Sequence, residues 1–191
     1  MVLSAPSGCG KTTILNRLLN RHPDWVRSVS VTTRPSRLGE KNGADYEFVT
    51  PRRFQSLKER RQFLEHARVF GQDYGTRRAA VEGGIKKGAT VVLTIDVRGA
   101  RSVRRLLRGK VPLLTIFVLP PSITVLRERL EKRSTDSPDE IDHRIEKAED
   151  EVKAAKEYDG TVINRDLAQT VRDIETLVKE FEKKLQTRRE K

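Results

Sequence analysis

The run A-P-S-G-C-G-K-T at residues 5–12 restricts the possible folds of this chain more than any other feature of its sequence. It fits the phosphate-binding loop pattern G-x-x-x-x-G-K-[ST], except that Ala5 stands where the first glycine usually is. The methyl group of Ala5 is tolerable if that residue keeps a negative φ. Gly8 and Gly10 let backbone N–H groups turn toward a phosphate with no Cβ in the way. The run therefore predicts an anion-binding loop, with a chance glycine-rich turn as the alternative.

The last two residues of this run carry its chemistry. We expect Lys11 to lie against the β- and γ-phosphates of a nucleotide and the hydroxyl of Thr12 to bind Mg²⁺. The stretch 12–21 is predicted to form a helix. Its N-terminal dipole then points at the bound phosphate.

The charge of the chain favours anionic partners. Its 191 residues suit a single domain and carry a formal net charge of +12, which favours nucleotides, nucleic acid or an acidic surface. Lys and Glu interleave along the C-terminal half, so solvated helix faces are an alternative explanation of this charge. Aromatic residues make up only 5%, with no aromatic-studded basic strand on which bases stack, so we do not expect nucleic acid as a partner.

The single cysteine and the hydropathy of the chain indicate the compartment. With Cys9 as its one cysteine the chain forms no internal disulfide, which suits a reducing environment. Its place in the loop fits either an oxidisable thiol or a small filler. No apolar stretch approaches the ~20 residues that span a bilayer, and no signal-peptide pattern opens the chain. We therefore expect a cytoplasmic protein without a membrane partner.

Hydrophobic periodicity and capping residues predict alternating strands and helices. The predicted strands are 28–31, 45–49, 89–97, 113–119 and 161–164. The predicted helices are 12–21, 51–60, 76–87, 99–108, 122–133, 137–158 and 167–186. Their expected caps are Thr50, Thr76, Ser122 and a capping box from Ser137 to Glu140. Residues 1–4 are short for a first strand, which leaves open whether residues are missing before them.

These elements predict an α/β fold with three layers. The runs 89–97 and 113–119 are almost continuously apolar, as parallel strands buried on both faces require, and 99–108 is the helix that connects them. We expect one domain, a three-layer α/β/α core around a parallel sheet, built from 1–32, 76–121 and 158–191. The stretches 33–75 and 122–157 are predicted to be insertions that close over the phosphate loop.

Further motifs resemble the guanylate kinases, a family of P-loop nucleoside monophosphate kinases. They are S-V-S-V-T-T-R at 28–34, R-x-G-E at 37–40, G-x-D-Y at 43–46, F-L-E at 63–65, Y-G-T at 74–76, I-D-x-x-G-A at 95–100, P-P-S at 120–122 and R-S-T-D at 133–136. The resemblance implies reversible transfer of a phosphoryl group from Mg-ATP to GMP, giving ADP and GDP. It makes 33–75 a GMP-binding insertion and 122–157 a lid.

The resemblance assigns the guanine base to an acidic pair. Guanine offers N1–H and N2–H₂ donors side by side, and one carboxylate accepts both. That carboxylate maps to Glu65, with Asp96 in support, and the hydroxyls of Ser30 and Thr76 serve the O6/N7 edge. Taken without its neighbours, Glu65 also fits an exposed carboxylate at a helix end.

The resemblance assigns the GMP phosphate to arginines and tyrosines. An arginine fork binds phosphate through two parallel hydrogen bonds, and a tyrosine donates a phenolic O–H. The positions concerned are Arg34, Arg37, Tyr46 and Tyr74. A single arginine on so basic a chain also fits an ordinary surface residue.

The lid supplies the remaining charge in this resemblance. Arg129, Arg133 and Arg144 stabilise the transferring phosphoryl group together with Lys11. Ordinary ion pairs with Glu128 or Glu131 are the alternative for the first two. The resemblance also places Asn164 near adenine. Together with the phosphate loop, the expected ATP contacts are Ser7, Gly8, Cys9, Gly10, Lys11, Thr12, Thr13 and Asn164.

Some residues depart from the family's usual pattern. Thr94 stands where an acidic residue is common, which puts a supporting role in Mg²⁺ binding in doubt. Ser134 replaces a lid glycine, Ser36 a proline, and Arg165 an acidic residue. Two rival functions remain: a non-catalytic guanylate-kinase-like binding module, and a kinase for another small phosphorylated acceptor such as a sugar. The oligomeric state stays open.

Overall fold

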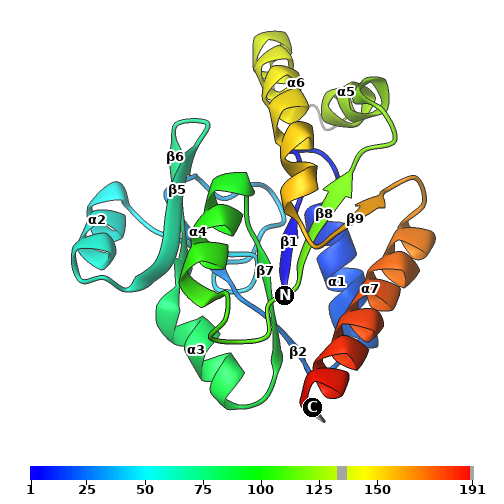
Figure 1. The fold of residues 1–191 in the computed structure, drawn as a ribbon. Helices are drawn as coiled ribbons and strands as arrows, with labels where there is room; N and C mark the ends of the chain where they lie inside the picture. The colour runs from blue at the N-terminus through cyan, green and yellow to red at the C-terminus, as the bar shows by residue number, and fades with distance from the viewer. Residues whose placement is uncertain (133–136, 190–191) are drawn as a thin grey trace.

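A five-stranded parallel sheet forms the centre of the molecule (Figure 1). The computed structural model describes residues 1–132 and 137–189, with residues 188 and 189 described by their backbone alone. The sheet order is β2-β7-β1-β8-β9. Its strands are β1 (Val2–Ser4), β2 (Trp25–Arg27), β7 (Thr90–Thr94), β8 (Thr115–Leu119) and β9 (Gly160–Ile163).

Helices cover both faces of this sheet, and neighbouring strand residues alternate between them. Leu3, Val92 and Ile116 pack in one cluster with α1 (Lys11–Arg21) and α7 (Leu167–Arg189). Val2 and Leu93 pack in a second cluster with α3 (Arg78–Lys86) and α4 (Val97–Leu107). The two helix pairs lie on opposite sides of the sheet in Figure 1, so the predicted three-layer α/β/α fold is confirmed.

A second, four-stranded sheet stands beside the first in the order β4-β3-β6-β5. It consists of β3 (Ser30–Thr32), β4 (Tyr46–Phe48), β5 (Phe63–Val69) and β6 (Gln72–Arg77), with α2 (Pro51–Glu59) packed against it. Its small core contains Val31, Phe54, Leu57 and Phe63. This sheet therefore has apolar packing of its own.

Two helices rise above the carboxyl ends of the central strands (Figure 1). They are α5 (Ile123–Glu131) and α6 (Pro138–Lys153), and a 3₁₀ turn at Ala154–Glu157 follows the second. The hydroxyl of Ser122 caps α5, and Ser137 with Glu140 forms the predicted capping box of α6. Within the described part of the chain, no helix is both long enough and apolar enough to cross a bilayer.

Three sequence-based expectations about elements were wrong. Thr76 does not cap a helix: it lies in β6, and α3 begins at Arg78 without a side-chain cap. The long helix predicted to 158 ends as an α-helix at Lys153. The strands β2, β5 and β6 were not predicted. The hairpin β5–β6 carries polar side chains that face the site, which weakens the alternation by which strands are recognised.

Candidate functional site

A cavity of about 420 Å³ opens between the phosphate loop, the second sheet and α6. Its position at the carboxyl ends of parallel strands is where α/β folds bind their ligands. Most of the predicted site residues line it, together with others that were not predicted. The predicted ones are Ser7, Gly8, Gly10, Lys11, Thr12, Thr13, Ser30, Arg34, Arg37, Tyr46, Glu65, Tyr74, Asp96 and Arg144.

The phosphate loop has the backbone that its sequence predicts. Gly8 and Gly10 have φ values of 92° and 81°, and Gly10 caps α1 in the left-handed conformation. Among described non-glycine residues only Arg61 and Phe70 have positive φ, so Ala5 keeps the negative φ that its methyl group requires. The Nζ of Lys11 donates to the carbonyl oxygen of Ala5, which folds this side chain along the loop.

Helix α5 packs closely behind the loop. A Cβ added to Gly8 lies 2.9 Å from Cδ1 of Leu126 and 3.0 Å from Cδ2 of Leu130, so any side chain larger than hydrogen displaces these leucines. Positive φ and close packing therefore both require glycine at this position.

A buried amide fixes the loop from its other side. The Nδ2 of Asn164 donates to the carbonyl oxygen of Cys9 over 2.9 Å, and both residues are buried. Arg129 in turn donates to the carbonyl oxygen of Asn164 over 3.0 Å. Neither Asn164 nor Arg129 lines the cavity, so the adenine contact assigned to Asn164 and the phosphoryl contact assigned to Arg129 stay predictions.

One of the predicted lid arginines reaches the loop directly. Nη1 of Arg144, on α6, donates to the hydroxyl oxygen of Ser7 over 2.9 Å. The third predicted arginine, Arg133, lies outside the described residues.

Glu65 occupies a buried position on β5 and is not an exposed carboxylate at a helix end. The Thr76 hydroxyl on β6 donates to its Oε1, and Thr76 itself is buried and does not line the cavity. A Cβ on Gly99 stands only 2.7 Å from Glu65 Oε2 and 3.3 Å from Asp96 Oδ1. Gly99 has no side chain and thus leaves free the space beside both carboxylates.

Burial changes the protonation of Glu65. Desolvation raises the pKa of Glu65 to about 7, and the charge of Asp96 adds to the shift, while the Thr76 hydrogen bond opposes it. Asp96 is the N-cap of α4 and accepts from the Gly99 N–H over 2.8 Å. The ionised form of Glu65 is costly without further hydrogen-bond donors. A ligand that offers two N–H donors to Glu65 therefore offsets this cost.

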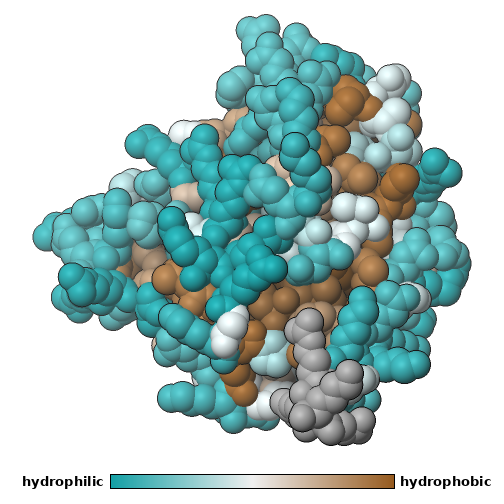
Figure 2. Space-filling model, in the orientation of Figure 1, coloured by the Kyte–Doolittle hydropathy of each residue, from teal (hydrophilic) through white to brown (hydrophobic). Residues whose placement is uncertain are grey.

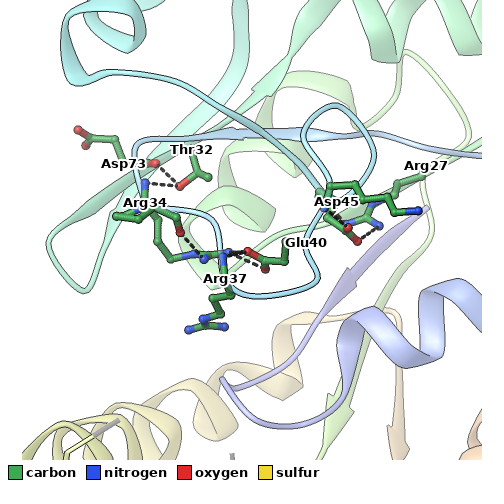
Figure 3. A network of polar contacts seen from close by, with 9 residues as sticks. Arg27, Thr32, Arg34, Arg37, Glu40, Asp45 and Asp73 are labelled. Atoms are coloured by element: carbon green, nitrogen blue, oxygen red, sulfur yellow. Dashed lines mark hydrogen bonds and ion pairs between the residues drawn. The ribbon is translucent and has the colours of Figure 1, made fainter. Parts of the chain in front are cut away.

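The two predicted phosphate-binding arginines differ in their surroundings (Figure 3). Nη2 of Arg34 lies 2.8 Å from Glu40 Oε1 and 3.0 Å from Oε2. Arg37 donates its backbone N–H to the same carboxylate over 2.7 Å, while its guanidinium points away from the pair. Glu40 therefore orders the loop that carries both arginines and leaves the charge of Arg37 directed elsewhere.

The two predicted tyrosines stand together on the second sheet. The rings of Tyr46 and Tyr74 meet edge to face with centroids 6.1 Å apart, and the Arg34 guanidinium lies 5.3 Å from the Tyr46 centroid. Both rings line the cavity.

Several cavity residues escaped the sequence-based assignment. Glu40 stood in a motif, Thr94 was noted only as a departure from the family pattern and Glu140 only as part of a helix cap, whereas Phe70 and Glu151 carried no signal. Burial raises the pKa of Glu151, against the opposing charges of Lys11 and Lys147. Glu151 lies 3.8 Å from Lys147, one turn earlier on α6. Only the tertiary fold brings this helix to the loop.

The comparison with known families agrees with this arrangement. A family model described as guanylate kinase matches residues 1–181. The chain belongs to the guanylate kinase family. Guanylate kinases are nucleoside monophosphate kinases, and this chain is an enzyme of that class.

Individual guanylate kinases are similar over nearly the whole chain. The guanylate kinase of Wolbachia sp. subsp. Brugia malayi is 48% identical over 93% of this chain and 90% of its own length. That of Alkalilimnicola ehrlichii is 45% identical over 92% of this chain and 85% of its own. The crystal structure of guanylate kinase from Anaplasma phagocytophilum superposes with a TM-score of 0.76 at 35% identity, covering 94% of this chain and 83% of that one.

Proposed function

We propose that the cavity seats ATP on the phosphate loop and GMP against the second sheet, so that the chain transfers a phosphoryl group reversibly from ATP to GMP. One observation carries this proposal above the others. A buried carboxylate, Glu65, lies in the same cavity as Lys11 of the phosphate loop and beside Asp96. A phosphate site and an acceptor of paired N–H donors in one cavity suit a phosphate donor and guanine together.

The acceptor nucleotide contacts three kinds of side chain in this proposal. Glu65 accepts from guanine N1–H and N2–H₂, and Ser30 and Thr76 lie toward the O6/N7 edge. Arg34, Arg37, Tyr46 and Tyr74 bind the GMP phosphate. The edge-to-face tyrosine pair and the Glu40 contacts support this because they order the two rings and the loop that carry these donors.

The donor nucleotide lies on the loop formed by residues 7–13, with Asn164 near its adenine. Lys11 and Arg144 stabilise the charge of the transferring phosphoryl group, and Arg129 and Arg133 complete the set from the lid. The hydrogen bond between Arg144 and Ser7 supports its part, since it already brings one lid guanidinium to the loop.

Mg²⁺ accompanies ATP in this proposal. The exposed Thr12 hydroxyl lines the cavity, and Asp96 and Glu151 line it too. The described residues contain no group of three His, Cys, Asp or Glu side chains placed to hold a metal, which suits an ion that keeps waters and binds mainly to phosphates. When bound, Mg²⁺ neutralises charge on the β- and γ-phosphates; Thr12 is its protein ligand.

The parts of the chain divide accordingly. We assign 1–32, 76–121 and 158–191 to the core, 33–75 to the GMP-binding insertion and 122–157 to the lid. The second sheet extends this insertion slightly, from Ser30 to Arg77. Closure of both parts over the nucleotides excludes water before transfer. A cytoplasmic location, where ATP and GMP are available, goes with this proposal.

The test measures ADP release with GMP, AMP, UMP and CMP as acceptors, for the wild type and for Glu65→Gln. We expect rapid turnover with GMP as the acceptor and not with AMP, UMP or CMP. The KM for GMP should rise in Glu65→Gln by about 10- to 100-fold, since a paired base contact is worth about 1–3 kcal/mol. The matched control is Glu59→Gln, an exposed carboxylate on α2, which leaves the KM unchanged. An unchanged KM in Glu65→Gln would refute the guanine assignment.

A further inference from the structure

The turn between β5 and β6 contains a strained phenylalanine. Phe70 and Gly71 have φ values of 48° and 74°, both positive, as the two central residues of a type I′ turn require. Glycine and asparagine adopt this conformation readily, whereas a bulky side chain there is a genuine outlier. Strain of this kind persists where the surrounding structure gains something from the residue.

The Phe70 ring lies against α6, where three basic residues surround it. The Arg144 guanidinium carbon lies 5.0 Å from the ring centroid and Nζ of Lys147 lies 4.2 Å from it. The ring of His143 meets it edge to face with centroids 5.7 Å apart. The distances from Arg144 and Lys147 fall within the range of cation–π attraction. The tip of the hairpin, which carries the GMP-binding residues, therefore contacts the lid helix.

The contact leads directly to the phosphate loop. Arg144, which lies by the Phe70 ring, also donates to Ser7 over 2.9 Å. A chain of two contacts thus joins the second sheet, the lid helix and the ATP loop. Phe70 itself lines the same cavity.

We propose that Phe70 is a positioning residue for phosphoryl transfer: its ring holds Arg144 over the phosphate loop and couples the GMP-binding sheet to the lid. This inference rests on the proposed function. Phe70 touches neither reacting phosphate; it acts through Arg144.

A ring suits this task better than a carboxylate. Glu40, a carboxylate, pairs with Arg34 and accepts hydrogen bonds from its Nη2. An aromatic face attracts a cation without accepting its in-plane hydrogen bonds or cancelling its charge. The contact with the ring therefore occupies none of the N–H groups of Arg144.

The decisive variant is Phe70→Asn. Asparagine relieves the strain of the turn but removes the ring, so the two roles of Phe70 separate. We expect the melting temperature to stay the same or rise, kcat to fall about 3- to 10-fold from the loss of cation–π attraction, and the KM for GMP to stay within about twofold. Phe70→Tyr keeps the ring and should retain the wild-type kcat. Phe70→Leu removes the ring, so its kcat should fall as in Phe70→Asn.

A double-mutant cycle identifies the partner. In an Arg144→Ala background we expect Phe70→Asn to cause little further loss of kcat, because the group that the ring holds is gone. Equal losses in both backgrounds, or a wild-type kcat in Phe70→Asn, would overturn the proposal.

Amide hydrogen exchange tests the contact without any catalysis. In Phe70→Asn without nucleotide we expect faster exchange over 138–153 and unchanged exchange over 167–189, which belongs to the core. Unchanged exchange over 138–153 would count against the coupling. A wild type that does not phosphorylate GMP would refute the proposed function, while the exchange result would still decide whether Phe70 holds α6.

Discussion

At the scale of single residues, the site depends on a carboxylate placed where water is scarce. Glu65 is 7% exposed and lies beside Asp96, with one hydroxyl donor from Thr76. Its ionised form is therefore costly in the free protein, which explains a pKa of about 7. In the proposed complex guanine supplies two further N–H donors to Glu65, so the same burial that disfavours the charge makes the proposed base contact selective.

This burial predicts how stability depends on pH. Between pH 4.5, the ordinary pKa of a glutamate side chain, and about 7, Glu65 binds its proton in the folded state but loses it when unfolded. The free energy of unfolding therefore falls as pH rises through this window, by roughly 2–3 kcal/mol. Glu65→Gln, which cannot ionise, should lack this loss. Urea unfolding of both proteins at several pH values checks it, and identical pH dependence would contradict it.

At the scale of elements, the phosphate loop depends on the helix behind it. Gly8→Ala forces a methyl group against Leu126 and imposes a strained φ of 92°. We expect a loss of about 2–4 kcal/mol in stability and a KM for ATP raised at least tenfold, because the loop must shift away from α5.

Gly109→Ala is the matched control for this prediction. Gly109 also has a positive φ, 79°, but nothing lies within 4 Å of an added Cβ. It should cost about 1–2 kcal/mol of backbone strain and leave the KM for ATP unchanged. Thermal unfolding and initial rates distinguish the two variants. Equal effects on KM would show that packing against α5 is irrelevant.

The sequence predicts some of the helices and strands of this molecule and misses others. The loop, the buried strand β8 and the helices α2 and α5 carry strong local signals, so they were predicted within about two residues of their observed bounds. The hairpin β5–β6 was missed because its side chains serve a cavity instead of alternating between core and solvent. Thr76 resembled a helix cap for a related reason: its hydroxyl serves Glu65, a partner that only strand pairing brings near.

Contacts between distant segments lay beyond sequence reasoning altogether. The motifs identified Glu65 and Asp96 through the family resemblance, but Gly99 as the space between them required the fold. Phe70 beside Arg144 is a similar case, since 74 positions of sequence separate a hairpin tip from a helix face. Such pairings depend on how the two sheets and α6 are arranged in space.

At the scale of the whole molecule, the chain is rich in charge, with 35% of its residues Asp, Glu, Lys or Arg. Hydrophilic residues dominate the face shown in Figure 2, while apolar side chains appear in the hollows between them. The formal net charge of +12 creates a positive field that attracts anionic nucleotides.

This field predicts a dependence on ionic strength. Raising NaCl from about 0.05 to about 0.5 M shortens the screening length to a few ångströms, so kcat/KM for GMP should fall several-fold while kcat changes little. Initial rates at constant free Mg²⁺ measure this, with sucrose as an uncharged solute for control. A kcat/KM that does not respond to salt would show that long-range attraction contributes nothing.

The two sheets separate the proposed recognition of the acceptor base from the proposed binding of ATP. Most of the side chains proposed to choose the base stand on one sheet, whereas the loop proposed to hold the triphosphate grows from the other, and the chain crosses between the sheets only before Ser30 and after Arg77. Substitutions in the second sheet can therefore change which nucleobase binds without altering the loop proposed to bind ATP. An engineer could graft a new acceptor module through the same two crossings.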